Sequence, residues 1–240
     1  MKHFIFALLA VCTLSLQAQV KQYAADVHKG ENGNVDLPYR YLAPEATPRG
    51  VKYPLVIFLH GSGERGTDNE KQLFHGSGLF LNPVNQEKYP AYVIIPQCPE
   101  GKTWKRDDVA PTVISLIEKY KNLPQVDDSR IYIIGLSMGA YGIYDIVTRR
   151  PDLFAVAVPI CGEGNVEKLP VAKDIAFSIY HGDADQAVPV EGSREAYVAL
   201  KKAGCKNLRY TEFAGTTHNS WNPAFNTPDF LKWIFSKRRK

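Results

Sequence analysis

Cysteine is scarce in this sequence, and no cluster of residues has the spacing of a metal site. One of the four cysteines in the 240 residues lies in an apolar N-terminal stretch, which leaves Cys98, Cys161 and Cys205. There is no CxxC pair, and no group of His and Cys is spaced like zinc ligands. Three cysteines allow one disulfide and one free thiol, and the sequence does not choose the pair.

An excess of positive charge is also lacking outside the two ends of the chain. The formal net charge is +4, but residues 237–240 (Lys-Arg-Arg-Lys) supply four positive charges and Lys2 supplies another. The rest of the chain is therefore close to −1, which argues against a nucleic-acid-binding face. We interpret the basic tail as a solvated helix end, where cations suit the helix dipole.

The apolar stretch near the N-terminus is too short to cross a bilayer. It covers residues 4–16, follows a basic residue, and is followed by Ala18, a small residue suited to cleavage. We predict that residues 1–18 are a signal peptide and that the mature chain (19–240) is exported by a bacterium. Its destination is the periplasm or the medium, and no association with a membrane is expected.

Apolar runs alternate with segments of helical period through the mature chain. The predicted strands are 35–43, 55–59, 92–95, 131–134, 154–160, 175–180 and 208–213, and the predicted helices are 107–121, 140–150, 193–203 and 229–237. A short helix is expected within 67–80, and an edge hairpin or loop over 19–34. Continuous apolar strands are typical of parallel sheets covered on both faces. We predict a single α/β domain with a doubly wound, mostly parallel sheet and no separate lid domain.

The pentapeptide Gly135-Leu-Ser-Met-Gly139 joins a strand-like run to a helix-like run. In this setting G-x-S-x-G predicts a nucleophile elbow, in which the serine stands on a sharp, strained turn. The two glycines would let strand and helix approach without side-chain clash. We predict that Ser137 is a nucleophile and that the Met138 N–H points to where a tetrahedral oxyanion would form.

A serine hydroxyl needs a base and an orienting carboxylate, and two later strand ends offer them. Asp183 and Asp185 follow one predicted strand, and His218 follows the last. Asp183 lies nearer its strand and is predicted to cap the turn, so Asp185 is the expected carboxylate. With His218 as the base, the order Ser…Asp…His is the one typical of this architecture.

Four other histidines in the mature chain are weaker candidates. His60 and His181 lie in turns at strand ends, where a structural hydrogen-bonding role is expected. Nothing near His28 or His75 in the sequence recommends either of them as a functional residue.

The turn His60-Gly-Ser-Gly63 follows a buried strand and is rich in backbone N–H groups. We expect Gly61 or Ser62 to provide the second donor to the oxyanion. The glycines would also suit a phosphate cradle, but no G-x-x-x-x-G-K-[ST] pattern follows, and Glu64 would repel phosphate.

The chain resembles the α/β-hydrolase superfamily in four places, which are His60-Gly-Ser-Gly63, Gly135-Leu-Ser-Met-Gly139, His181-Gly-x-x-Asp-x-x-Val-Pro189 and His218. It is similar in particular to the carboxylesterase/phospholipase and prolyl-oligopeptidase-like group, which includes polyhydroxybutyrate depolymerase-like and feruloyl esterases. This resemblance implies a Ser-Asp-His hydrolase that needs no metal or other cofactor. The chain lacks the propeller domain of a prolyl oligopeptidase and the lid of a typical lipase.

The leading hypothesis is a secreted serine carboxylesterase that acts on feruloyl or acetyl groups of plant polysaccharides. The alternatives are a serine peptidase, a phospholipase or small-molecule esterase, and a non-catalytic binding protein. Trp104 is a candidate aromatic wall for the acyl group, and Cys161 and Glu163 are candidate pocket residues. The oligomeric state is open.

Overall fold

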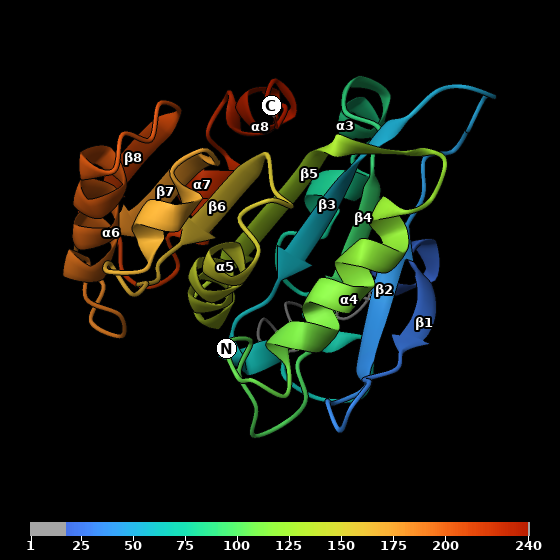
Figure 1. The fold of residues 1–240 in the computed structure, drawn as a ribbon, viewed down its shortest axis with the longest axis horizontal. Helices are drawn as coiled ribbons and strands as arrows, with labels where there is room; N and C mark the ends of the chain where they lie inside the picture. The colour runs from blue at the N-terminus through green and yellow to red at the C-terminus, as the bar shows by residue number, and fades with distance from the viewer. Residues whose placement is uncertain (1–17, 240) are drawn as a thin grey trace, which may run out of the picture.

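The computed structural model describes residues 18–239, which form an eight-stranded sheet with helices on both faces (Figure 1). The predicted signal peptide lies outside the described residues except for Ala18, so it stays a prediction. The strands are β1 (Ala24–His28), β2 (Leu37–Leu42), β3 (Tyr53–Leu59), β4 (Tyr92–Pro96), β5 (Val126–Leu136), β6 (Val156–Ile160), β7 (Ala176–Gly182) and β8 (Leu208–Phe213).

The strand order in space is β1-β2-β4-β3-β5-β6-β7-β8. β2 pairs antiparallel with both β1 and β4, whereas every pair from β4 to β8 is parallel. This confirms the predicted doubly wound, mostly parallel sheet. The edge hairpin or loop predicted over 19–34 is wrong in extent: this segment holds one edge strand, β1, its antiparallel partner β2 lies beyond it, and residues 18–22 are helical.

The helices are α2 (Gly78–Leu81), α3 (Pro83–Lys88), α4 (Ala110–Lys121), α5 (Met138–Arg149), α6 (Glu191–Lys202), α7 (Trp221–Phe225) and α8 (Phe230–Phe235). Three 3₁₀ turns cover Ser62–Glu64, Lys71–Leu73 and Leu169–Ala172. The helix predicted within 67–80 is wrong in extent, because that segment holds a 3₁₀ turn and only the start of α2. Among the described residues, none of the helices is both long and apolar enough to cross a membrane.

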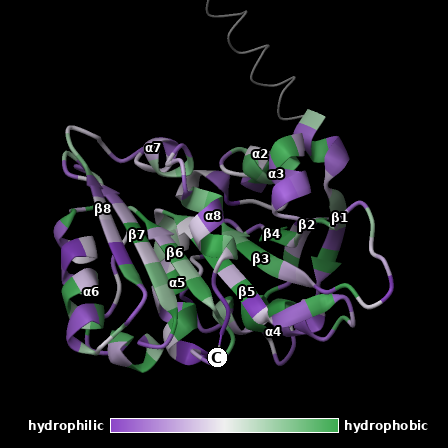
Figure 2. Ribbon diagram, turned by 90° about the horizontal axis from the view of Figure 1, so that it is seen from above, coloured by the Kyte–Doolittle hydropathy of each residue, from purple (hydrophilic) through white to green (hydrophobic). Residues whose placement is uncertain are grey.

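The sheet separates two apolar cores, as the alternation along β3 shows. Leu55, Ile57 and Leu59 point into the core shared with α4, α5 and α6. Val56 and Phe58 point into the core shared with α2 and α8. Figure 2 shows these two helical layers on opposite sides of the sheet. Burial on both faces explains why the strands are continuous apolar runs.

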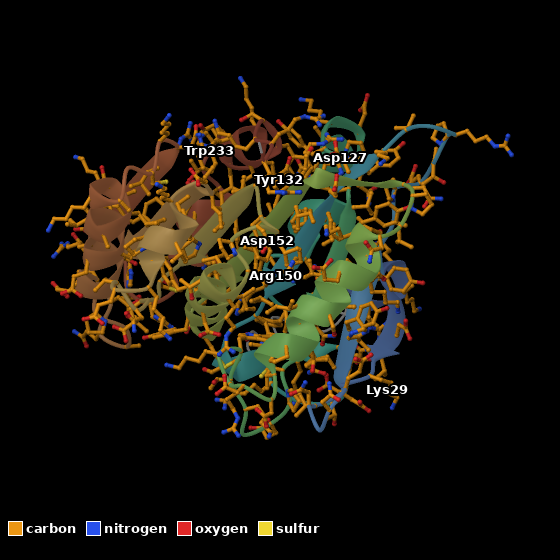
Figure 3. All side chains as sticks on the ribbon, viewed as in Figure 1. Lys29, Asp127, Tyr132, Arg150, Asp152 and Trp233 are labelled. Atoms are coloured by element: carbon orange, nitrogen blue, oxygen red, sulfur yellow. The ribbon has the colours of Figure 1, made fainter. Side chains whose placement is uncertain are left out.

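The basic tail lies beyond α8 and is held against β5 by side chains labelled in Figure 3. The Tyr132 hydroxyl donates to the Lys237 carbonyl at 2.9 Å, and Arg238 Nη1 lies 2.9 Å from Asp127 Oδ2. The interpretation of the tail as a solvated helix end is therefore right only in part: Arg238 is 61% exposed and the Lys237 N–H donates to Ile234 O, but α8 ends at Phe235 and the tail also contacts β5.

Helix α5 lies so close to the sheet that only glycine fits at the crossing. A Cβ added to Gly139 would lie 2.0 Å from the Leu59 carbonyl oxygen, and one added to Gly135 would lie 2.9 Å from the Gly139 backbone. These are the two glycines of the pentapeptide, so the predicted close approach of strand and helix is confirmed. It fixes the residue between them, Ser137, at the carboxyl end of β5.

We predict that Gly139→Ala lowers the free energy of unfolding by about 2 kcal/mol or more, because β3 or α5 has to shift to admit the methyl group. Urea unfolding measures the change. Gly63→Ala is the matched control, since an added Cβ there meets nothing within 4 Å. Equal stability of the two variants would contradict the proposed close approach.

Candidate active site

Ser137 occupies the turn between β5 and α5 in a conformation that side chains rarely adopt. Its φ is 51° and its ψ is −119°, outside the favoured regions for a residue with a Cβ. The turn is held by backbone hydrogen bonds: the Ser137 N–H donates to Ile160 O at 2.9 Å, and the Ala140 N–H donates to Ser137 O at 2.8 Å. The structure thus has the strand–turn–helix arrangement expected around a nucleophile elbow.

The structure brings Asp185 and His218 to this serine from the ends of β7 and β8. His218 Nε2 lies 2.9 Å from Ser137 Oγ, and His218 Nδ1 lies 2.7 Å from Asp185 Oδ2. Because a carboxylate only accepts hydrogen bonds, Nδ1 carries the proton and Nε2 is free to accept the serine proton. The three predicted triad residues therefore lie in line, each within hydrogen-bonding distance of the next.

The Asp185 carboxyl group is fully buried and yet remains suited to carry a charge. Burial alone would raise its pKa, but hydrogen bonds from the Val188 N–H, His218 and the Ala187 N–H outweigh burial and hold the pKa below its ordinary value. Asp183 is not part of this arrangement, because its Oδ1 accepts a hydrogen bond from the Gly215 N–H at 2.6 Å. It caps the turn, as the sequence predicts.

Backbone N–H groups next to Ser137 are free to bind an oxyanion. A Cβ added to Gly61 would lie 3.7 Å from Ser137 Cβ, which places the His60–Gly63 turn beside the serine. Within residues 18–239, the N–H groups of Gly61, Ser62 and Met138 donate no hydrogen bond to another protein group. The structure therefore does not choose between Gly61 and Ser62 as the second donor beside Met138.

The buried side chain of His60 fixes the conformation of the same turn. Its Nε2 accepts a hydrogen bond from the Cys98 N–H at 2.9 Å, so its Nδ1 must carry the proton and donate to Gly61 O at 2.6 Å. The side chain is fully buried, and burial lowers the pKa of His60 to about 4. This neutral imidazole has the structural role predicted for it.

The aromatic wall predicted at Trp104 is wrong. Trp104 is 0% exposed, and its indole N–H donates to the His60 carbonyl at 2.9 Å. The ring packs against the His60 imidazole at a centroid distance of 4.9 Å, and Gly142 leaves room for its Cβ. Trp104 therefore supports the turn that carries the oxyanion donors and offers no surface to a substrate.

Cys161 is a buried residue beneath the triad, with a φ of 47°, and not an exposed pocket wall. Its Sγ and the ligand atoms of Asp185 and His218 lie within 4.8 Å of one another. A thiol ligates metals as the thiolate, and burial raises the pKa of Cys161 to about 12. Asp185 and His218 are already bonded to each other, so this donor set suits a triad better than a metal.

Glu163 is exposed, and its Cβ lies close to Gly192 in α6. It is thus available at the surface as the sequence suggests, although no contact in the structure ties it to the triad.

Cys98, Cys161 and Cys205 are all free thiols, so the disulfide that the sequence allows is not formed.

The sequence did not predict a row of aromatic rings that begins at the base, His218. The Trp221 ring lies 5.6 Å from the His218 ring, the His75 ring lies 5.1 Å from Trp221, and the Phe74 ring lies 4.7 Å from His75. Phe74 is 54% exposed. We call these four rings the aromatic row. The position of Trp221 three residues after His218 is a signal that could have been used, whereas His75 lies in a loop without periodicity.

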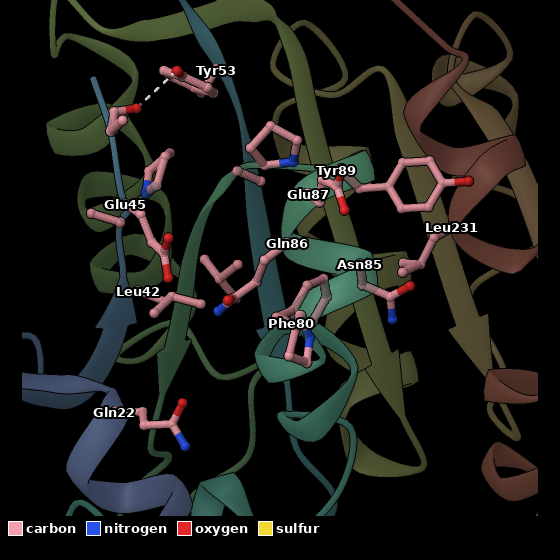
Figure 4. A pocket seen from close by; sticks show the side chains of 17 residues that line it. Gln22, Leu42, Glu45, Tyr53, Phe80, Asn85, Gln86, Glu87, Tyr89 and Leu231 are labelled. Atoms are coloured by element: carbon pink, nitrogen blue, oxygen red, sulfur yellow. Dashed lines mark hydrogen bonds between the residues drawn. The ribbon is translucent and has the colours of Figure 1, made fainter. Parts of the chain in front are cut away.

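A cavity of about 580 Å³ lies away from the triad, at the end of the sheet where β2 ends and β4 begins (Figure 4). Phe80, Val93 and Leu231 form part of its apolar lining, with Glu45 and Glu87 among its polar residues. No triad residue lines it, so the candidate active site is a separate surface feature at the carboxyl ends of the strands, where ligands bind in sheets of this type.

A mostly parallel sheet with a strained serine after β5 and its carboxylate and imidazole after β7 and β8 defines an α/β-hydrolase fold. The chain belongs to the phospholipase/carboxylesterase family, which it matches over residues 89–232. This finding agrees with the resemblance recognised in the sequence.

Known proteins of similar sequence or structure include esterases, a depolymerase and, at the level of the fold, acylaminoacyl peptidases. The chain is 35% identical to a thermostable esterase, with a TM-score of 0.88 over 92% of this chain and 64% of that one. It is 26% identical over 242 residues to poly(3-hydroxyalkanoate) depolymerase C of Paucimonas lemoignei, but spans only about half (54%) of that relative. A ferulic acid esterase from Anaeromyces mucronatus, solved with ferulic acid, shares the fold at a TM-score of 0.67 and 18% identity, over 90% of each chain.

The depressed pKa of His60 predicts a loss of stability in mild acid. Between its ordinary pKa of 6.5 and its folded value of about 4, the unfolded chain binds a proton that the folded chain does not. The free energy of unfolding should therefore fall by about 3 kcal/mol from this residue alone as the pH drops through that window.

Urea unfolding at several pH values between 7 and 4 tests this, with His60→Asn beside the wild type. Asparagine can still donate to Gly61 O but does not titrate, so the pH dependence in the variant should be weaker. His28→Asn is the comparison variant: burial lowers the pKa of His28 too, but this side chain is partly exposed, so its removal should weaken the pH dependence less than that of His60. An unchanged pH dependence in His60→Asn would contradict the role of His60.

Proposed function

We propose that this protein is an exported serine carboxylesterase in which Ser137, His218 and Asp185 are the catalytic triad. The observation that carries the proposal is a continuous chain of hydrogen bonds. It joins Ser137 Oγ to His218 Nε2 at 2.9 Å and His218 Nδ1 to Asp185 Oδ2 at 2.7 Å. Membership of the phospholipase/carboxylesterase family supports the same conclusion. The reaction needs no metal and no organic cofactor.

The geometry supports hydrolysis in two stages. Ser137 Oγ attacks the ester carbonyl while His218 Nε2 takes its proton, and the Met138 N–H group, together with that of Gly61 or Ser62, stabilises the oxyanion. His218 then passes the proton to the leaving alcohol, which gives an acyl-enzyme. Water repeats the sequence and releases the acid. Asp185 keeps the proton of the imidazole on Nδ1 throughout.

The aromatic row supports a substrate with an aromatic acyl group. Phe74 is a large apolar side chain that is 54% exposed, and successive ring contacts through His75 and Trp221 connect it to the base. A planar acyl group stacked there would cover apolar ring surface. We propose feruloyl esters of plant polysaccharides as substrates, with acetyl esters as the second candidate class. The structural relative with bound ferulic acid agrees with this choice.

We expect Ser137→Ala to lower kcat for ester hydrolysis by about a thousandfold or more, because the nucleophile is lost. The assay uses p-nitrophenyl acetate, methyl ferulate, acetylated xylan and a proline-linked p-nitroanilide. Ser236→Ala, at the residue that follows α8, should keep full activity. Ester turnover that survives in Ser137→Ala would refute the proposal, and a preference of the wild type for the anilide would point to a peptidase.

For Phe74→Ala we expect KM for methyl ferulate to rise by about threefold to tenfold, the value of one aromatic contact. KM for p-nitrophenyl acetate should not change. Val84→Ala removes an equally exposed side chain (54%) elsewhere on the surface and serves as the control. An equal effect of Phe74→Ala on both esters would show that the aromatic row does not bind the acyl group.

A further inference from the structure

A second histidine contacts the Asp185 carboxylate. His181, in β7, is 0% exposed, and its Nε2 lies 3.2 Å from Asp185 Oδ2 and 3.1 Å from Val188 O. The Asp185 oxygen that accepts the hydrogen bond from His218 thus also lies next to His181. The mechanism described above makes no use of this contact.

The neighbours of the His181 ring determine where its proton lies. Both atoms near Nε2 are acceptors, so Nε2 must carry a hydrogen. Burial lowers the pKa of His181 and leaves the ring neutral, with a lone pair on Nδ1. The Ser193 hydroxyl lies 2.7 Å from Nδ1 and 2.9 Å from Gly162 O, and its single hydrogen can serve only one of these two acceptors at a time. The two acceptors at Nε2 therefore fix the tautomer with the hydrogen on Nε2.

With this hydrogen in place, the Asp185 carboxylate has four donors. Oδ1 accepts from the N–H groups of Ala187 (2.9 Å) and Val188 (3.0 Å). Oδ2 accepts from His218 at 2.7 Å and from His181 at 3.2 Å. A carboxylate has about four lone-pair sites. The group is therefore fully bonded, and it cannot rotate away from His218 without losing buried hydrogen bonds.

We propose that His181 is a positioning residue, which holds the Asp185 carboxylate in the orientation that His218 requires and draws part of its negative charge away from His218. The inference rests on the proposed function, because its consequence is the behaviour of the triad. Other groups that face His181 and its partners are Glu212 on β8, Tyr144 on α5 and Cys161 after β6.

The test compares two substitutions of His181. His181→Leu removes the donor, so Asp185 holds more charge for His218, and the acid limb of the kcat/KM profile should move to higher pH by about half a unit. At the pH optimum, kcat should fall by about tenfold with little change in KM, because a hydrogen bond to a charged group is lost. His181→Gln places an amide N–H near the Nε2 position and should restore both values most of the way.

A purely structural role of His181 would give a different result. Lower thermal stability with an acid limb unchanged in His181→Leu, or equal profiles for the Leu and Gln variants, would overturn the proposal. If His181→Leu does not fold, His181→Phe decides instead. It keeps a planar ring without a donor and should shift the acid limb in the same direction, and an unshifted limb would overturn the proposal.

A second readout does not depend on turnover. The proton NMR resonance of the N–H shared by His218 and Asp185 should move in His181→Leu and stay near its wild-type position in His181→Gln. An unmoved resonance in both variants counts against the proposal. Failure of the proposed function would appear separately, as a wild type without Ser137-dependent ester hydrolysis.

Discussion

The close approach of α5 to β3 and β5 is the constraint on which the candidate site depends. Gly135 and Gly139 lack the side chains that would hold the helix away, and Ser137 between them takes a φ of 51°. Such a conformation costs about 1 to 3 kcal/mol, which the packing around it has to offset. The result is a hydroxyl raised at the end of a rigid strand, with the Met138 N–H beside it.

Buried neutral histidines stabilise the loops around this turn. His60 joins the turn after β3 to the end of β4 through the Cys98 N–H, and His181 joins the turn after β7 to α6 through Ser193. Each ring has one donor and one acceptor nitrogen, so each can connect two backbone segments of opposite polarity without adding charge. Burial lowers the pKa of both rings and keeps them in that form.

The parts of the site that follow strand ends could be predicted from the sequence. Apolar runs locate the strands, parallel strands end at one edge of the sheet, and Ser137, Asp185 and His218 each follow such a run. The role of Trp104 could not be predicted in this way. Its burial depends on the empty space at Gly142 in α5, thirty-eight residues away in the chain.

Other features depend on tertiary contacts that local sequence patterns do not record. His75 has its place in the aromatic row because its ring contacts Trp221. Trp221 lies on α7, and this helix of five residues is too short to give a periodic pattern in the sequence. The pairing of Arg238 in the tail with Asp127 likewise joins the C-terminal residues to the start of β5.

Labelling with a fluorophosphonate tests the central claim most directly, because such a reagent reacts with a serine only when a neighbouring base activates it. Mass spectrometry of the wild type should show one adduct per chain, on the peptide that contains Ser137. His218→Gln should lose the adduct while its fold is kept. A protein that hydrolyses esters without labelling at Ser137, or that labels at another serine, would contradict the account.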